Sequence, residues 1–372
     1  MAPLQPADWP LARPDVENLQ SYSAPLEGRR GLLRLDFNEN TVGPSPKVVE
    51  AIRAIPSEDY AIYPEYDGLR EAFGQALGGI APAQIGLFNG ADAAIHAICQ
   101  AYGSRGEVML TTNPTFGYYS PCARMQGMVI NAIPYSGSDF RFPLEDIGRA
   151  LTQLNPRLLL LCNPNNPTGT RLEPEAILKL AAASPSTLVV VDELYEAFTG
   201  DSLLPPLLQR AAGGDPFAKH RNLVVLRSLS KTAGIAGLRL GIAVGAEPVV
   251  ERISRVTGPY DINSFGVTAA FAALQDHAYV DAYVDEVLKA KAWLVEQLVK
   301  AGVRHHSSGG NYLLIWPANG AEPCEAALKA EGILVRSMAG KALIDGSLRV
   351  SIGTCEQMER FWSVYQQITS QP

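Results

Sequence analysis

The chain has 372 residues, of which 47% are hydrophobic and 19% are charged, and it carries a formal net charge of −7. At roughly 150 residues per domain, this length predicts two or three domains, each with an ample core. The acidic balance and the absence of a dense Lys/Arg run argue against a nucleic-acid partner, and no apolar run reaches the roughly 18 residues that a membrane span requires.

The first two thirds of the chain predict a sheet. Residues 1–44 are too few to fold alone, and we expect them to dock on the domains that follow. Between residues 45 and 260, short apolar runs predict strands buried on both faces at 84–88, 108–111, 128–133, 158–162, 188–191, 223–226 and 240–244. Helical stretches such as 91–101 and 173–182 separate them, which is typical of an α/β domain whose mostly parallel sheet binds ligands at the carboxyl ends of its strands.

The pattern changes after about residue 260. A long helical region at 267–301 is followed by short apolar runs at 311–316, 333–336 and 348–351, with a further helix after the first of them. Short strands around helices predict a smaller α+β domain at 261–372.

Lys231 ends the segment SLSK at 228–231, which follows the strand predicted at 223–226. A lysine amine can form an imine with an aldehyde, and Ser228, Ser230 and Arg239 carry groups that can hold a phosphate. Taken alone, the segment is explained equally well as a surface turn, so its interpretation depends on partners elsewhere in the chain.

Asp192 ends another apolar strand, where a carboxylate is buried and needs a cationic partner. A protonated pyridine nitrogen would be such a partner, and the cationic ring would act as an electron sink. Tyr195, three residues later, is within reach of a ring hydroxyl. The alternative is a structural carboxylate that caps a helix. Glu193 is discounted as an acid–base partner because adjacent strand residues face opposite ways.

Two more loops follow predicted strands. The segment CNPNNPTG at 162–169 forms a tight loop in which the Asn166 amide can donate to a phenolate oxygen. The segment NGAD at 89–92 begins a helix, where free N–H groups bind phosphate well. An ordinary N-cap by Asn89 or Asp92 is the simpler explanation of that segment alone.

Together these segments resemble the class I/II aminotransferase superfamily of fold type I pyridoxal phosphate enzymes. The resemblance runs nearly end to end and also rests on LDFNEN at 35–40, GPSP at 43–46, YP at 63–64, NY at 311–312, GILVR at 332–336 and RVSIGT at 349–354. Within the superfamily the chain is most similar to the histidinol-phosphate aminotransferases. The resemblance implies the fold type I architecture, with a large α/β domain around a mostly parallel seven-stranded sheet, a smaller α+β domain, and a homodimer.

By that resemblance, Lys231 holds pyridoxal 5'-phosphate as a Schiff base and moves the substrate Cα proton. Asp192 pairs with the pyridine nitrogen, and Tyr195 and Asn166 hydrogen-bond the ring oxygen. The other cofactor-binding residues would be Phe116, stacked on the ring, Ala91, Asp92, Ser228, Ser230 and Arg239 around the phosphate, and Tyr63 from the partner subunit.

The resemblance also implies a substrate pocket. Arg349 matches the arginine that binds the α-carboxylate, and the remaining matches are Arg336, Tyr22 and Tyr63 at the distal phosphate, with Asn38 beside them. Two departures concern the substrate: Thr41 replaces a common proline, and Ser21 stands where a proline often precedes Tyr22.

The implied activity is transfer of the amino group of histidinol phosphate to 2-oxoglutarate, in two half-reactions, as a step of histidine biosynthesis. Three alternatives stay open: an aromatic amino acid aminotransferase, a decarboxylase of the threonine-phosphate type, and a non-catalytic cofactor-binding regulator. The last is disfavoured because such regulators carry a DNA-binding module, for which the chain has no room ahead of its catalytic domain.

The remaining reactive side chains predict no further site. The five cysteines contain no C-x-x-C pair, which is typical of reduced thiols in a cytoplasmic protein. His305 and His306 have no third ligand nearby, so no metal is expected. Residues 1–14 are rich in proline and lack the apolar core of a signal peptide.

Overall fold

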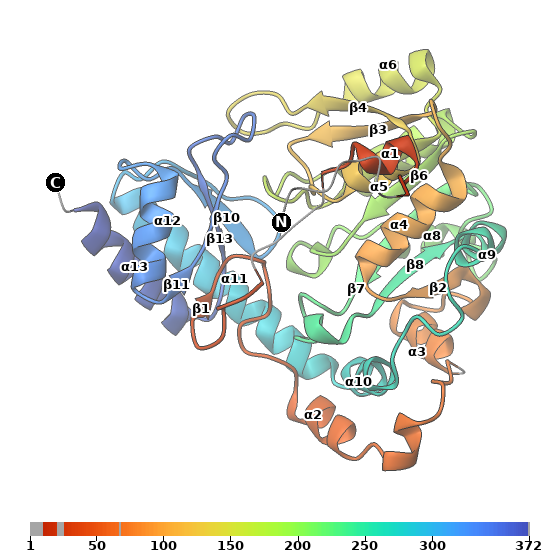
Figure 1. Ribbon diagram of the computed structural model, residues 1–372, viewed down its shortest axis with the longest axis horizontal. Coiled ribbons are helices and arrows are strands. Elements are labelled where there is room, and N and C mark those ends of the chain that lie inside the picture. The colour runs from red at the N-terminus through yellow and green to blue at the C-terminus, as the bar shows by residue number, and fades with distance from the viewer. Residues whose placement is uncertain (1–9, 21–25, 67, 371–372) are drawn as a thin grey trace.

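A seven-stranded sheet organises the larger part of the protein (Figure 1). The computed structural model describes residues 10–20, 26–66 and 68–370, and its sheet has the order β2-β8-β7-β6-β5-β3-β4. The strands are β2 (Ile85–Phe88), β3 (Val108–Asn113), β4 (Val129–Pro134), β5 (Leu158–Cys162), β6 (Leu188–Asp192), β7 (Leu223–Ser228) and β8 (Gly241–Gly245). Strands β3 to β7 run parallel, and β8 is antiparallel to β2 and β7, which confirms the predicted mostly parallel sheet.

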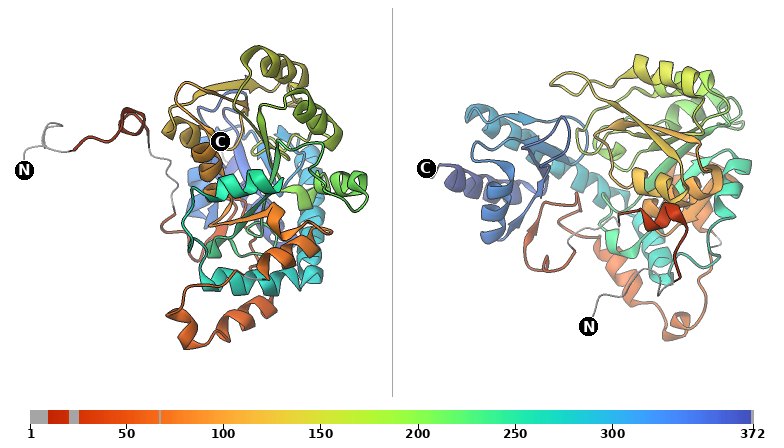
Figure 2. Two further views of the ribbon diagram at one scale, coloured as in Figure 1. Left: turned by 90° about the vertical axis from the view of Figure 1, so that its right-hand side faces the viewer. Right: turned by 45° about the horizontal axis from the view of Figure 1, so that its top comes forward.

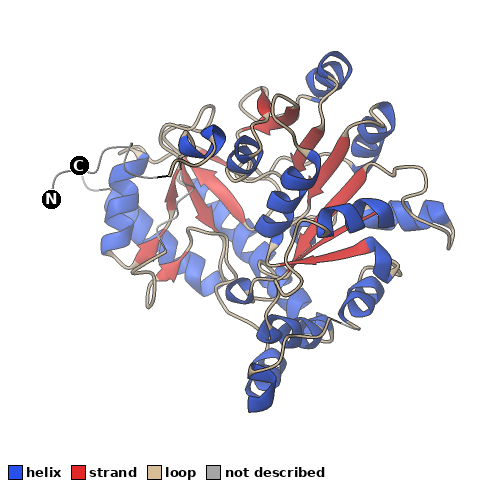
Figure 3. Ribbon diagram, turned by 45° about the vertical axis from the view of Figure 1, so that its right-hand side comes forward, coloured by secondary structure: helices blue, strands red, loops and turns tan. Residues whose placement is uncertain are grey.

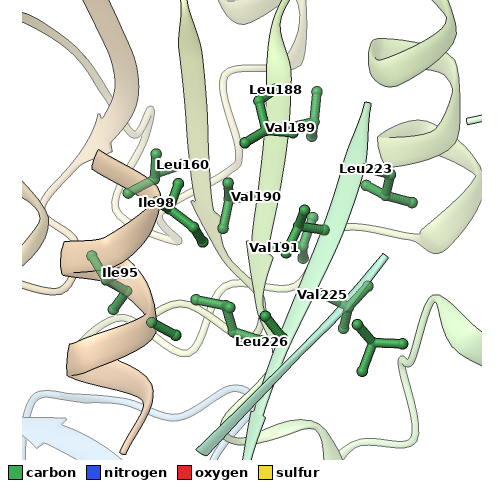
Figure 4. Packing of buried hydrophobic residues seen from close by; sticks show 14 of the residues in the cluster. Ile95, Ile98, Leu160, Leu188, Val189, Val190, Val191, Leu223, Val225 and Leu226 are labelled. Atoms are coloured by element: carbon green, nitrogen blue, oxygen red, sulfur yellow. The ribbon is translucent and has the colours of Figure 1, made fainter. Parts of the chain in front are cut away.

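Helices pack around this sheet (Figures 2 and 3). They are α4 (Ala91–Tyr102), α5 (Tyr119–Met125), α6 (Leu144–Leu154), α7 (Pro174–Ala183), α8 (Leu204–Ala211) and α9 (Glu247–Ser254). Figure 4 shows Ile95 and Ile98 of α4 beside strand residues such as Val190, all essentially inaccessible to solvent. The prediction of burial on both faces is wrong for β4, where Val129 is 54% exposed because β4 is an edge strand.

The smaller unit contains a four-stranded sheet of order β12-β13-β10-β9. Its strands are β9 (His305–His306), β10 (Tyr312–Ile315), β12 (Arg336–Ser337) and β13 (Leu348–Ser351), and its helices are α11 (His277–Lys300), α12 (Ala321–Ala330) and α13 (Cys355–Thr369). The single strand predicted at 333–336 is wrong. The chain instead divides at Val335, because β11 (Ile333–Leu334) pairs with β1 (Leu33–Arg34) while β12 pairs with β13.

The helical region predicted at 267–301 is two helices rather than one. Helix α10 (Ser264–Leu274) begins after Asn263, whose side chain caps it, and α11 begins at His277. Helix α10 packs against α2 (Pro46–Arg53) and α3 (Leu69–Ala76), which belong to the larger unit. The domain boundary at 260/261 therefore stays a prediction.

The N-terminal segment contacts both units. Helix α1 (Pro14–Glu17) lies against α5, where the Arg13 guanidinium donates to the Met125 carbonyl. Further along, Leu33 and Leu35 are buried in the core of the smaller unit. Single-turn 3-10 helices lie at η2 (Ser57–Tyr60), η3 (Pro82–Gln84), η4 (Glu196–Phe198) and η5 (Ala236–Leu238). Within the described ranges, no helix has the length and apolar character needed to cross a membrane.

Candidate active site

The side chains predicted to carry chemistry gather at one edge of the large sheet. Strand β6 ends at Asp192, β7 ends at Ser228, and Asn166 lies in the loop that follows β5. Because β5, β6 and β7 are parallel neighbours, their carboxyl ends lie together, and Lys231 follows β7 at the same edge. The predicted strand-end location is confirmed.

Asp192 is a buried carboxylate whose hydrogen-bond donors are neutral. The Tyr119 hydroxyl donates to its Oδ2 at 2.8 Å, and the Leu194 amide donates to its Oδ1 at 3.2 Å. Burial raises the pKa of Asp192 to about 6, and the hydrogen bond from Tyr119 opposes that rise. Among the residues that the structure describes, no basic side chain forms an ion pair with Asp192. The carboxylate can therefore receive a cation from a ligand.

Sequence reasoning did not single out Tyr119. Its side chain is 1% exposed, and a buried tyrosine hydroxyl needs a hydrogen-bond partner. That rule signals a contact without identifying Asp192, which lies 73 residues away in the chain.

Lys231 lies in the same site as a lysine of unusually low basicity. Its Nζ donates to the Phe37 carbonyl at 2.9 Å. Burial, together with the nearby Arg349 guanidinium, lowers the pKa of Lys231 to about 8. An appreciable fraction of free amine therefore exists near neutral pH, and the free amine is the form that attacks an aldehyde.

A hydrogen-bonded network joins Tyr195 to Arg349. The Tyr195 hydroxyl accepts from Asn38 Nδ2 at 3.0 Å and from Asn166 Nδ2 at 3.1 Å. The Asn166 Oδ1 accepts from Arg349 Nη1 at 2.8 Å. Asn38 is held in the left-handed region, at φ 55°, which asparagine tolerates, and its backbone N–H donates to Ser351 Oγ at 2.8 Å. Residues from both units are thereby fixed around one phenol.

The proposed phosphate-binding groups also lie together. Ser228 Oγ is 2.8 Å from Ser230 Oγ, and Arg239 Nη2 donates to Asp92 Oδ2 at 3.2 Å. Helix α4 starts after Gly90 and has no side-chain cap, so neither Asn89 nor Asp92 serves as its N-cap. Gly90 is required there, because a Cβ would lie 2.5 Å from Arg239 Nη2 and its φ is +85°. An uncapped helix start beside an arginine and two serines fits an anion.

Arg336 and Arg349 face each other across two strands. They are directly paired in the antiparallel register of β12 and β13. The Arg336 guanidinium lies 5.7 Å from the Phe37 ring centroid, and no ion pair within the described ranges includes Arg336. Like charges opposite each other destabilise a sheet. The pair is therefore suited to an anionic ligand.

Two predicted residues stand outside these contacts. Tyr63 is 68% exposed and stacks on Tyr260, with ring centroids 3.9 Å apart, rather than on any residue of the site. Tyr22 lies outside the described residues. Phe116, by contrast, is at the site: its ring meets the Tyr119 ring edge-on, with centroids 5.5 Å apart.

Glu193 faces away from the site, as its place next to Asp192 on a strand requires. Its carboxylate is fully buried and accepts from Arg227 Nε at 2.9 Å and from the Leu203 amide at 2.8 Å. Burial raises the pKa of Glu193, and Arg227 opposes that rise. Because Arg227 precedes Ser228, this ion pair joins the ends of β6 and β7 behind the site.

The chain belongs to the class I and II aminotransferases, since the family described as "Aminotransferase class I and II" matches residues 30–364. Among individual relatives, the histidinol-phosphate aminotransferase of Thermoanaerobacter pseudethanolicus is 31% identical over 93% of this chain and 95% of its own length.

Solved structures share the fold. The histidinol-phosphate aminotransferase of Sinorhizobium meliloti, solved in complex with pyridoxal-5'-phosphate, superposes with a TM-score of 0.87 at 24% identity, over 97% of this chain and 98% of that one. The L-threonine-O-3-phosphate decarboxylase of Porphyromonas gingivalis has a TM-score of 0.77 at 25% identity, over 91% of this chain and all of that one (100%). The predicted fold type I architecture is confirmed.

Proposed function

We propose that the protein is a pyridoxal phosphate-dependent aminotransferase that moves the amino group of histidinol phosphate to 2-oxoglutarate. The observation that carries the choice of substrate is the facing pair Arg336 and Arg349, of which Arg349 acts electrostatically on Lys231. Family membership and the likeness to histidinol-phosphate aminotransferases support the same reaction.

The residues present fit pyridoxal phosphate. Asp192 is a buried carboxylate with no cationic partner among the described residues, so it is free to pair with a protonated ring nitrogen. The start of α4 with Arg239 suits the phosphate, and Lys231 supplies an amine for the aldehyde. When bound, the cofactor supplies a carbonyl carbon for amine exchange and a ring that takes up electron density from the substrate Cα.

The chain's own groups would then hold and move protons. Asp192, which keeps a hydrogen bond from Tyr119, favours a protonated ring nitrogen. Asn166 and Tyr195, which are hydrogen-bonded to each other, would offer hydrogen bonds to the ring oxygen. Lys231, whose pKa is about 8, would move a proton from the substrate Cα to the cofactor's carbonyl carbon in the first half-reaction and in the reverse direction in the second.

Arg336 and Arg349 would orient both substrates. Histidinol phosphate carries a phosphate and no carboxylate, whereas 2-oxoglutarate carries two carboxylates, so one pocket must accept two kinds of dianion. A guanidinium group pairs with carboxylate or phosphate through two donors, and two such groups side by side suit either substrate.

A second copy of the chain would complete the site with Tyr63. Exposed apolar side chains cluster around Tyr63, namely Tyr60, Ile62, Tyr260 and Phe265, which are between 36% and 61% exposed. An exposed aromatic patch of this kind is typical of a protein interface. The cytoplasmic location stays a prediction, which the five free cysteines support because disulfides mark oxidising compartments.

Substrate preference tests the proposal against its rivals. Purified holoenzyme is assayed for glutamate formation from 2-oxoglutarate with histidinol phosphate or phenylalanine, and for carbon dioxide release from O-phosphothreonine without a keto acid. We expect kcat/KM for histidinol phosphate to exceed that for phenylalanine by about tenfold or more, a difference of about 1.4 kcal/mol. Preference for phenylalanine would assign the aromatic activity, and carbon dioxide release would assign the decarboxylase.

Mixing two inactive variants tests the shared site. Lys231→Ala removes the amine, and Tyr63→Ala removes the side chain proposed to act in the partner. If Tyr63 acts across the interface, a mixed dimer contains one site with both residues intact, so activity returns on mixing under conditions that exchange subunits. No recovery, with exchange shown by differently tagged copies, would place Tyr63 in its own subunit's site or outside catalysis.

The cofactor is checked independently: Lys231→Ala should abolish borohydride trapping of the cofactor.

A further inference from the structure

A cavity of about 940 Å³ lies at the opposite edge of the large sheet from the candidate active site. Its walls come from the segments that precede β5, β6 and β7 and from the start of α9, which follows β8. Strand β6 has five residues, so the two edges are roughly 16 Å apart at about 3.3 Å per residue. Small-molecule sites occupy roughly 300–1,000 Å³. The cavity therefore has the size of a ligand site and is separate from the first.

Three arginines line the cavity. Arg157 precedes β5, Arg221 precedes β7 and Arg252 lies on α9. In the described part of the chain, none of the three forms an ion pair. In a chain with a net charge of −7, three arginines around one cavity, none of them paired with a carboxylate within the described ranges, are a local departure from the overall charge.

Two of these arginines lie close to Tyr102. The Arg157 guanidinium lies 5.6 Å from the ring centroid, and its Nε donates to the Tyr102 carbonyl at 3.0 Å. Burial raises the pKa of Tyr102, and the nearby Arg252 and Arg157 oppose that rise, as two cations close to the phenol must. Arg157 is thus held in place through its Nε. Its two terminal nitrogens take no part in that bond and remain available to an anion.

The rest of the lining contains apolar residues, such as Leu188 and Val249, beside polar ones. Pro185, Pro216 and Pro248 form part of the walls. Beneath them, Asn222 Nδ2 donates to three backbone carbonyls, those of Ala181, Ser184 and Thr187, at distances from 2.9 to 3.0 Å. A preformed pocket of this kind spares a ligand the entropic cost of ordering loops.

Two carboxylates limit the positive charge of the lining. Asp215 accepts from Gln84 Nε2 at 2.7 Å and from the Phe217 amide at 2.9 Å, and Glu247 lies in the first turn of α9. The excess is therefore about one positive charge, which suits a small anion and not a polyanion. We propose that the cavity is a second ligand site, for a small organic anion with an apolar ring and one phosphate or carboxylate group.

Calorimetric titration of the holoenzyme tests this site with phenyl phosphate as the phosphate probe and phenylacetate as the carboxylate probe. The test variant carries Arg157→Gln, Arg221→Gln and Arg252→Gln. The matched control carries the same charge change at Arg30, Arg124 and Arg360, which do not line the cavity. Circular dichroism establishes that both variants fold.

We expect at least one probe to bind with a dissociation constant between micromolar and low millimolar, and the probe that binds identifies the acid group. Binding should weaken about tenfold or more in the test variant, equivalent to about 1.4 kcal/mol, and stay unchanged in the control. The proposal is overturned if neither probe saturates the protein, or if the test variant binds as tightly as the unaltered chain. Equal weakening in the control would also overturn it, since the effect would then be one of net charge.

Discussion

Replacing Lys291 by methionine should change how the stability of the protein depends on pH. Lys291 lies on α11 with 7% of its surface exposed, and its Nζ donates to the carbonyls of Ser308 and Gly310, the latter at 2.8 Å. No carboxylate pairs with it among the described residues. Burial lowers the pKa of Lys291 from 10.5 to about 8.

The sign of the effect follows from proton uptake. Between pH 8 and 10.5 the unfolded chain holds a proton on Lys291 that the folded chain has lost, so folding becomes more favourable as pH rises through this window. A shift of this size corresponds to about 3 kcal/mol at most, of which about 2–3 kcal/mol is regained between pH 7 and pH 10. The methionine variant lacks this gain.

The assay is urea unfolding of both holoenzymes at matched protein and cofactor concentrations, from pH 7 to pH 10. We expect the unfolding free energy of the unaltered protein, minus that of Lys291→Met, to rise with pH by about 2–3 kcal/mol. Subtraction removes the contribution of groups common to both proteins. Lys300→Met is the matched control, because Lys300 is on the same helix but is 63% exposed and paired with Glu296.

A difference that stays flat from pH 7 to pH 10, or falls, would refute the assignment of a depressed pKa to Lys291. At neutral pH, the sign of the difference in unfolding free energy between Lys291→Met and the unaltered protein is less informative. The variant leaves buried carbonyls without a donor, at a cost of about 1–3 kcal/mol each, but it also removes the desolvation of a buried ammonium group. The slope therefore tests the reasoning, and the value at one pH does not.

Three other substitutions probe the surroundings of the site. Arg227→Met leaves the buried Glu193 carboxylate unpaired and should lower the unfolding free energy by about 3–5 kcal/mol in urea titration; a loss below about 1 kcal/mol would contradict a buried ion pair. Tyr119→Phe removes a hydrogen bond that lowers the pKa of Asp192, so the acid limb of the kcat–pH profile should move to higher pH, and an unmoved limb would count against that contact. Gly309→Ala places a Cβ 2.7 Å from the Pro164 side chain and 2.9 Å from the Gly169 carbonyl, in the loop that carries Asn166. We expect kcat/KM to fall about tenfold or more with the fold retained. Full activity would show that this loop moves to accept the methyl group without displacing Asn166.

The sheet and its strand-end chemistry could be predicted because their signals are local. Most of the buried strands are short apolar runs; Asp192 stands directly after one of them, and Lys231 follows another by a few residues. The position of a residue at the end of a parallel strand places it at the ligand edge, whatever its distance in the chain from the other residues there.

What the sequence could not show depends on long-range pairing. Val335 separates two short strands because the residues on its two sides pair with distant parts of the chain. Ile333 pairs with Leu33, and Ser337 pairs with Leu348. The facing of Arg336 and Arg349 depends on the same register, which no local pattern in GILVR specifies. Tyr119 is similar, since its partner is identified only once β6 is in place.

The N-terminal segment contacts the candidate active site more extensively than its local sequence pattern predicts. Three consecutive residues, Asp36, Phe37 and Asn38, each contact a different candidate active-site side chain. The backbone carbonyl of Asp36 accepts from Arg349, and that of Phe37 accepts from Lys231. The side-chain amide of Asn38 donates to the Tyr195 hydroxyl.

The position of this segment is set from both sides. Strand β1 pairs with β11 just before it, and the Asp36 carboxylate is held by Arg29 at 2.7 Å. Two of its three contacts use backbone carbonyls, which any residue supplies, so the side chains of the segment carry no signal for them. A stretch whose own pattern predicts docking, and to which the resemblance adds a role only for Asn38, therefore connects Lys231 of the larger unit to Arg349 of the smaller one. A shift of β1 along β11 would displace both groups together, so the geometry between amine and guanidinium depends on strand pairing outside the site.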